Sequence, residues 1–158
     1  MKLLLLPAAI LLAGLFCTAS AGPAWAQGQC TGPPSNVRLI VDVQNVRSSN
    51  GLIAVTLYPD VSARFLARRG ALYVGRVPAR APSTRVCIHL PSTGVYALAV
   101  YHDADGNRRI NRTSLGLPDE DFGFSNNPRV LFGIPAFRSV RLNVPRTNMQ
   151  ATIRLREP

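Results

Sequence analysis

The stretch VYALAVYHDADGN, residues 95–107, decides how this sequence is expected to fold. The residues before His102 are apolar or aromatic at every position, which is typical of a β-strand that is covered on both faces. The strand then runs directly into oxygen-bearing side chains at Asp103, Asp105 and Asn107. We therefore expect a central strand that delivers a polar loop to one edge of a β-sheet.

Several other short runs alternate between apolar and polar residues. In residues 37–44, Val37, Leu39, Val41 and Val43 would share one buried face. Turns rich in Pro, Gly and Asn separate these runs, and only residues 61–69 have the spacing of a short helix. The pattern predicts an all-β fold, a single antiparallel β-sandwich of seven to eight strands with one long loop and at most one short helix.

Two turns are expected to join consecutive strands as hairpins. Residues 48–51 contain an Asn-Gly pair, which supplies the positive φ angles of tight turns, so the strands before and after them are predicted to pair. Residues 145–148 are expected to join the last two strands, 137–144 and 149–155, in the same way.

The first 26 residues are predicted to be a signal peptide. Lys2 provides a positive start, residues 3–16 an apolar run and Ala24-Trp25-Ala26 a cleavage site between small residues. The apolar run is too short for a membrane anchor and carries Pro7. We expect cleavage after Ala26, a periplasmic or secreted β-sandwich domain over residues 27–158, and no transmembrane segment after cleavage.

Two cysteines, Cys30 and Cys87, lie in the predicted mature chain. An exported protein with two cysteines favours a disulfide between them, and two unpaired buried thiols are the alternative. The bond would close a long loop and contribute roughly 4 kcal/mol to stability in the chain-entropy model.

The mature chain is strongly basic. Lys2 is the only lysine, so its removal leaves 17 arginines against 8 acidic residues, a net charge of +9. Anionic envelope components would suit this charge as partners, whereas export argues against nucleic acid. The arginines are also scattered rather than clustered with aromatic residues, so a solvated cationic surface is the other interpretation.

The loop that follows His102 allows two interpretations. Asp103, Asp105, Asn107 and Asn111 stand where positions one, three, five and nine of a calcium-binding loop would lie, which would make them ligands of Ca²⁺. The same residues are also good turn formers, and their carboxylates would then pair with neighbouring arginines without any cofactor.

Two positions depart from the calcium-loop pattern. The sixth position, a glycine in such loops, is Arg108, and the twelfth, a glutamate, is Ser114. The acids of residues 119–121 could complete a cation site from further along the loop, or pair with the arginines of residues 108–112.

Four segments together carry a resemblance to a known family: residues 96–107, 115–118, 121–127 and 132–137. They resemble the bacterial family called domain of unknown function 2141, in which a His-Asp-x-Asn/Asp-Gly-Asn segment precedes a Gly-Phe-Ser-Asn-Asn segment. The predicted sandwich is immunoglobulin-like or transthyretin-like, and the resemblance implies an exported sandwich of the transthyretin or carboxypeptidase-regulatory type, with no established activity. Members often have Gly at the position of Arg108 and Asp at that of Asn111, so this chain departs from the family there.

Catalysis finds little support in the sequence. Only His89 and His102 could act as bases at neutral pH, and His102 and Asp103 are strand neighbours that should point to opposite faces. No Gly-x-Ser-x-Gly elbow surrounds Ser125. We expect a protein that is not an enzyme, with a hydrolase using His102 as the least favoured function.

A binding role for the 102–127 loop is the remaining class. Phe122, Phe124 and Asn126, with His102, could stack on and hydrogen-bond a ligand, although the two phenylalanines could equally plug one end of the sandwich. We therefore predict an exported, non-catalytic binding or envelope-structural module, with a calcium-dependent module as the alternative.

Overall fold

The protein is described by a computed structural model that covers residues 29–116, 118–130 and 134–158. The predicted signal peptide, residues 1–26, lies outside the described residues. None of the helices in the described part has the length and the apolar character that crossing a membrane would require.

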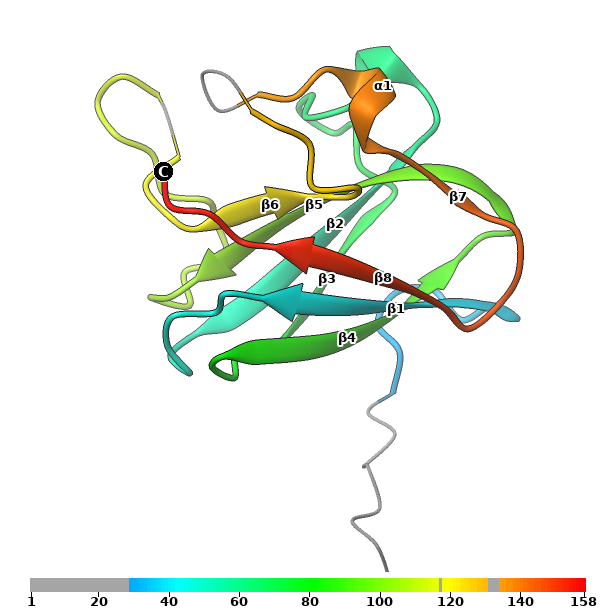
Figure 1. The fold of residues 1–158 in the computed structure, drawn as a ribbon, viewed down its shortest axis with the longest axis horizontal. Coiled ribbons are helices and arrows are strands. Elements are labelled where there is room, and N and C mark those ends of the chain that lie inside the picture. The colour runs from blue at the N-terminus through cyan, green and yellow to red at the C-terminus, as the bar shows by residue number, and fades with distance from the viewer. Residues whose placement is uncertain (1–28, 117, 131–133) are drawn as a thin grey trace, which may run out of the picture.

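Two β-sheets lie one above the other (Figure 1). The three-stranded sheet has the order β4-β1-β8, and the five-stranded sheet has the order β3-β2-β5-β6, with β7 also paired to β5. All pairs are antiparallel except β1 with β8. The strands are β1 (Val37–Gln44), β2 (Leu52–Pro59), β3 (Tyr73–Pro78), β4 (Ser83–Leu90), β5 (Gly94–Asp103), β6 (Phe122–Phe124), β7 (Arg141–Val144) and β8 (Met149–Arg154). The predicted all-β sandwich is confirmed.

Strand β5 is covered on both faces, as its sequence predicts. Leu98 and Val100 face the main core between the two sheets, and Ala97 faces a second apolar cluster on the outer side of the five-stranded sheet. Along its length β5 pairs with β2 on one side and with β6 and β7 on the other. A strand in this position carries the loop that follows it on a rigid support.

The main core is built from the alternating residues of the strands. Leu39, Val41 and Val43 of β1 are fully buried, as are Ile53, Val55 and Leu57 of β2. Full burial of each such side chain contributes about 1.5–3 kcal/mol. The fully buried residues of the other strands that join this core are Val86, Ile88, Leu90, Leu98, Val100, Val144 and Ile153.

Both predicted hairpins are wrong. Strands β1 and β2 lie in different sheets, and so do β7 and β8. In the first connection Val46 is buried in the main core, so the chain crosses from one sheet to the other instead of turning back on itself. Strand β8 likewise crosses over and lies parallel to β1. Turn chemistry at residues 48–51 and 145–148 marks a change of direction but does not choose the pairing partner.

Helical structure also differs from the prediction. Residues 61–69 contain only the 3-10 helix η1 (Ser62–Arg64), and Leu66 has a φ of 55°, which is incompatible with a continuing helix. The short helix α1 (Phe137–Val140) replaces the start of the strand predicted at 137–144. It places Phe137 5.7 Å from Phe65, measured between ring centroids, so aromatic packing takes precedence over strand pairing here.

The Cys30–Cys87 disulfide is present and joins the N-terminal segment to β4. Thr31 makes two backbone hydrogen bonds beside the disulfide. Its N–H donates to the Cys87 carbonyl at 2.9 Å, and the Thr31 carbonyl accepts from the His89 N–H at 2.9 Å. The segment before β1 is therefore fastened to the three-stranded sheet.

Candidate functional site

The end of β5 points two polar side chains in opposite directions. His102 turns toward the inner side of the sheet, and its Nε2 lies 2.9 Å from the carbonyl oxygen of Asn50. The backbone N–H of His102 donates to the carbonyl of Asp121 at 2.9 Å, which fastens the far end of the loop to β5. Asp103 turns the other way and is fully buried.

The loop after Asp103 closes into a tight turn. Oδ2 of Asp103 accepts a 2.8 Å hydrogen bond from the backbone N–H of Arg108, and Oδ1 of Asp105 accepts one of 3.0 Å from the N–H of Asn107. Gly106 and Arg108 have φ angles of 72° and 66°. Arg108 thus adopts the left-handed conformation for which calcium loops use glycine at this position.

Gly51 lies against the backbone of this turn. A Cβ atom added at Gly51 would lie 1.9 Å from the carbonyl oxygen of Asp103, and its φ is 67°. The Asn-Gly pair at residues 50–51 is therefore needed for close contact between the β1–β2 connection and the end of β5, rather than for a hairpin.

Three carboxylates converge beside the turn. One oxygen of each of Asp103, Asp105 and Glu120 lies within 4.8 Å of the others. Asp103 is 0% exposed and Glu120 is 7% exposed. Within the described part of the chain, Oδ1 of Asp103 and Oε1 of Glu120 are buried without a hydrogen-bond partner. Buried carboxylate oxygens without a partner are costly, so their arrangement calls for a positively charged partner.

No arginine supplies that charge in the part of the chain that the structure describes. The ion pairs found there involve other acids: Asp42, Asp60, Asp121 and Glu157. The expected pairing of the loop carboxylates with neighbouring arginines does not form among these residues. Within residues 29–116, 118–130 and 134–158 the three carboxylates therefore face one another without a compensating cationic side chain.

The environment shifts the pKa of two of these acids in opposite directions. Burial raises the pKa of Glu120, and the charges of Asp103 and Asp105 add to the increase. Hydrogen bonds, first from Asn111 and then from the backbone of Asn107, lower the pKa of Asp105. Asp105 is thus held in its charged form, whereas the charge on Glu120 is disfavoured.

Asn107 and Asn111 both contact Asp105 through their amide groups. Their Nδ2 atoms donate to Oδ2 of Asp105 at 2.7 and 3.0 Å, and Asn107 Nδ2 also donates to Asn111 Oδ1 at 2.8 Å. The four residues predicted as metal ligands are thus brought together, with the two amides as donors to Asp105. Glu120 was missing from that set, and the sequence signal for it was only the density of acids at 119–121.

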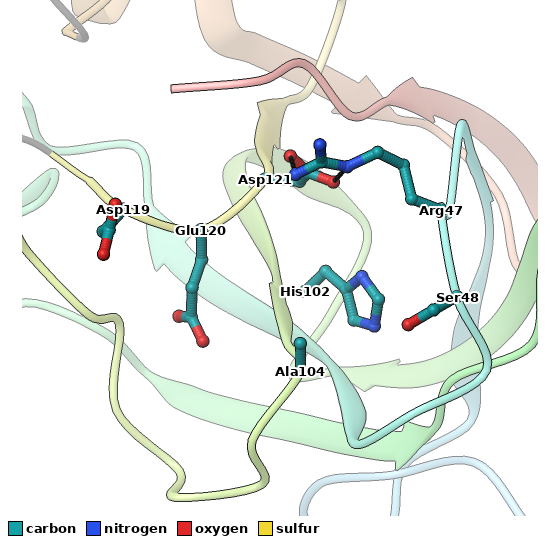
Figure 2. A pocket seen from close by; sticks show the side chains of 7 residues that line it. All are labelled: Arg47, Ser48, His102, Ala104, Asp119, Glu120 and Asp121. Carbon is teal, nitrogen blue, oxygen red and sulfur yellow. Dashed lines mark hydrogen bonds and ion pairs between the residues drawn. The ribbon is translucent and has the colours of Figure 1, made fainter.

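Asp121 and Glu120 are neighbours with separate roles. Arg47 holds the buried Asp121 through two 2.6 Å hydrogen bonds. Figure 2 shows the Glu120 side chain extending away from this pair, on the side of Ala104. The residues in Figure 2 line a cavity of about 320 Å³: Arg47, Ser48, His102, Ala104, Asp119, Glu120 and Asp121.

The residues predicted to bind an organic ligand do not meet in one place. His102 lines the cavity of Figure 2, whereas Phe122 and Phe124 lie on β6 and line a second cavity on the outer face of the sheet. Nδ2 of Asn126 donates to the carbonyl of Arg141 at 2.8 Å, where it supports the chain. The segment 122–124, predicted as loop, is a short strand because it pairs with β5.

Fold and site together define an all-β sandwich protein with an acid-lined loop at the end of its central strand. The chain belongs to the family described as uncharacterized proteins conserved in bacteria (DUF2141), whose model matches residues 41–152. The resemblance found in the sequence is thereby confirmed. Among curated proteins and among solved structures, none matches this chain.

Proposed function

We propose that this protein is an exported, non-catalytic module whose loop binds a divalent cation, Ca²⁺, between Asp103, Asp105 and Glu120. The observation that carries the proposal is the pair of buried carboxylate oxygens on Asp103 and Glu120 that have no partner among the described residues. Together with Asp105 they bring three oxygens within 4.8 Å of one another.

Calcium suits this donor set better than a softer metal would. Ca²⁺ takes six to eight oxygen ligands in flexible geometry, and the three carboxylates supply three of them, one oxygen each. Asn107 and Asn111 lie beside Asp105, and rotation of either amide would present a further oxygen. Glu120 would take the role of the glutamate that is absent at Ser114, reaching the ion from the far end of the loop.

Binding would remove an electrostatic penalty already present in the fold. Asp103 and Glu120 are buried and Asp105 is exposed, and like charges held this close repel and raise the free energy of the cation-free protein. A cation neutralises them and ties the beginning of the loop at Asp103 to its end at Glu120. The role proposed for the site is therefore to rigidify a surface module.

Export is part of the proposal. The predicted signal peptide and the Cys30–Cys87 disulfide support it, because disulfides persist in oxidising compartments. Calcium sites of extracellular modules bind with dissociation constants of about 10⁻⁴–10⁻³ M, so millimolar concentrations are the range to test.

Thermal unfolding with increasing Ca²⁺ tests this function. Calcium at about ten times its dissociation constant should stabilise the fold by about 1.4 kcal/mol, a rise of roughly 3–6 °C in melting temperature. Asp105→Asn should abolish most of the rise, whereas Asp119→Asn, which changes an exposed acid of the same loop, should keep it. No rise at about 10 mM calcium, or an equal rise in Asp105→Asn, would contradict the proposal.

A further inference from the structure

A second cavity lies on the outer face of the five-stranded sheet, separate from the acidic site. It has a volume of about 260 Å³. Its floor is formed by strands β2, β5 and β6, through Tyr58, Ala99, Tyr101, Phe122 and Phe124. We refer to it as the outer-face cavity.

The floor of the outer-face cavity is unusual for the outer side of a sheet. Outer faces of antiparallel sheets are commonly solvated and polar, whereas this one carries four aromatic rings. Phe122 and Phe124 pack edge to face, with centroids 5.8 Å apart, and Phe65 packs against Phe124 with centroids 6.0 Å apart. The rings are fixed by their neighbours, so the floor is preformed.

Apolar side chains also stand exposed at the walls. Leu66 is 39% exposed and Ile134 is 68% exposed, and both line the cavity. The left-handed conformation of Leu66, with a φ of 55°, is uncommon for a bulky residue and carries a conformational cost. Exposed apolar groups around an apolar floor are a recurring mark of a binding site.

One positive charge lies at the wall of the cavity. Arg112 lines it, and its Nη1 donates to the carbonyl of Gly116 at 2.7 Å, which holds the guanidinium in place. Among the described residues no carboxylate lies within 4.0 Å of Arg112. The remaining N–H groups of the guanidinium suit a carboxylate, which arginine can bind through two parallel hydrogen bonds.

We infer that the outer-face cavity binds a small monocarboxylate, with its apolar body on the aromatic floor and its carboxylate at Arg112. The volume sets the size of this ligand. A cavity of about 150 Å³ holds benzene, and sites for drug-sized molecules begin at about 300 Å³. A medium-chain fatty acid or a simple aromatic acid lies between these limits. The inference does not depend on the cation proposal.

Calorimetric titration of the folded protein with octanoate tests the inference, with 1-octanol as the neutral analogue. Octanoate should bind saturably to one site per chain, and more tightly than octanol. Arg112→Gln should lower the affinity for octanoate about tenfold and leave the affinity for octanol unchanged. Arg109→Gln, which removes an exposed arginine of the same loop that does not line the cavity, should change neither.

A cavity-filling variant provides the second arm. Ala99→Leu places additional apolar volume on the floor of the cavity. It should lower the affinity for both octanoate and octanol at least about tenfold, while the melting temperature stays the same or rises. Ala63→Leu, at an exposed position of η1, is the matched control. Absence of saturable octanoate binding, unchanged affinity in a folded Ala99→Leu variant, or unchanged octanoate affinity in Arg112→Gln would each overturn the inference. Association with phospholipid vesicles without octanoate binding would also overturn it.

Discussion

The backbone N–H of Arg108 donates a 2.8 Å hydrogen bond to Oδ2 of Asp103, five residues earlier in the chain. This bond closes the loop at the end of β5 and requires the left-handed φ of 66° that Arg108 adopts. An arginine therefore occupies the conformation that a glycine would adopt without strain, next to a group of three carboxylates.

Replacing Arg108 with glycine should strengthen cation binding. The left-handed conformation costs a non-glycine residue about 1–2 kcal/mol, which Arg108→Gly relieves in part, since glycine also gains entropy in the unfolded chain. The change also removes a positive charge near the three carboxylates. Calcium titration calorimetry should show higher affinity. Arg109→Gly is the control because Arg109 does not have a positive φ, and higher affinity in that variant alone would contradict the explanation.

Glu120 should make the cation-free protein less stable as the pH rises. Its pKa is raised by burial above its ordinary 4.5, so between that value and the folded pKa the native chain binds more protons than the unfolded chain. The free energy of unfolding therefore falls with increasing pH through this window. Glu120→Gln should remove the decline, raise stability at neutral pH and eliminate stabilisation by calcium. Urea melts across this pH range measure the free energy of unfolding. Asp119→Asn is the control, and it should keep both the decline with pH and the stabilisation by calcium.

Gly51 should tolerate no side chain. In Gly51→Ala the new Cβ would collide with the Asp103 carbonyl oxygen, at a separation of 1.9 Å, and its φ of 67° adds strain. At Gly106 the φ is similar, at 72°, but no atom lies within 4 Å of the added Cβ. Gly106→Ala should therefore cost only about 1 kcal/mol, and Gly51→Ala at least about twice as much. Equal costs in denaturant melts would show that the contact with Asp103 is unimportant.

Ser125 should act as a structural residue. It is fully buried, accepts a 3.0 Å hydrogen bond from the Leu98 N–H and donates to the carbonyl of Val140. Ser125→Ala leaves these two backbone groups without their partner, which should cost about 1–3 kcal/mol of unfolding free energy. Ser139→Ala removes a hydrogen bond from a half-buried serine to the Ala136 carbonyl that lies exposed to solvent, and should cost much less. A Ser125→Ala protein as stable as the parent would contradict this role.

The two proposed sites should influence each other. Ile110 and Pro118 line the outer-face cavity, while their neighbours Asn111 and Asp119 belong to the loop that holds Glu120. Calcium that orders this segment should therefore raise the affinity for octanoate, and octanoate should raise the affinity for calcium by the same factor. Titrating each ligand in the presence of the other measures both factors, and affinities that stay unchanged in both titrations would contradict the coupling.

Much of the fold could be predicted from local pattern. The two-sided apolar character of residues 95–101 identified the central strand, because a strand with apolar residues on both faces needs cover on both. The alternation in residues 37–44 identified β1 and its buried face. The cysteine pair was also correctly predicted.

Only part of the candidate site could be predicted from the sequence. Asp103, Asp105, Asn107 and Asn111 were named from their spacing, because a curved loop brings alternate side chains together. Glu120 could not be chosen over Asp119 or Asp121, since all three acids are adjacent in an irregular segment. The pairing of Asp121 with Arg47 and the turn of the Glu120 side chain toward Asp103 depend on where β6 attaches to β5.

By itself, the sequence determined where most of the strands lie and which of their faces are buried, because alternation and turn chemistry act between near neighbours along the chain. The tertiary structure alone decided which sheet each strand joins and which carboxylates meet. Those choices depend on contacts between residues far apart in sequence, such as Val46 within the core and Glu120 beside Asp103. Local pattern carries no information about such pairs, since the free energy that selects them arises only when segments far apart in sequence come into contact.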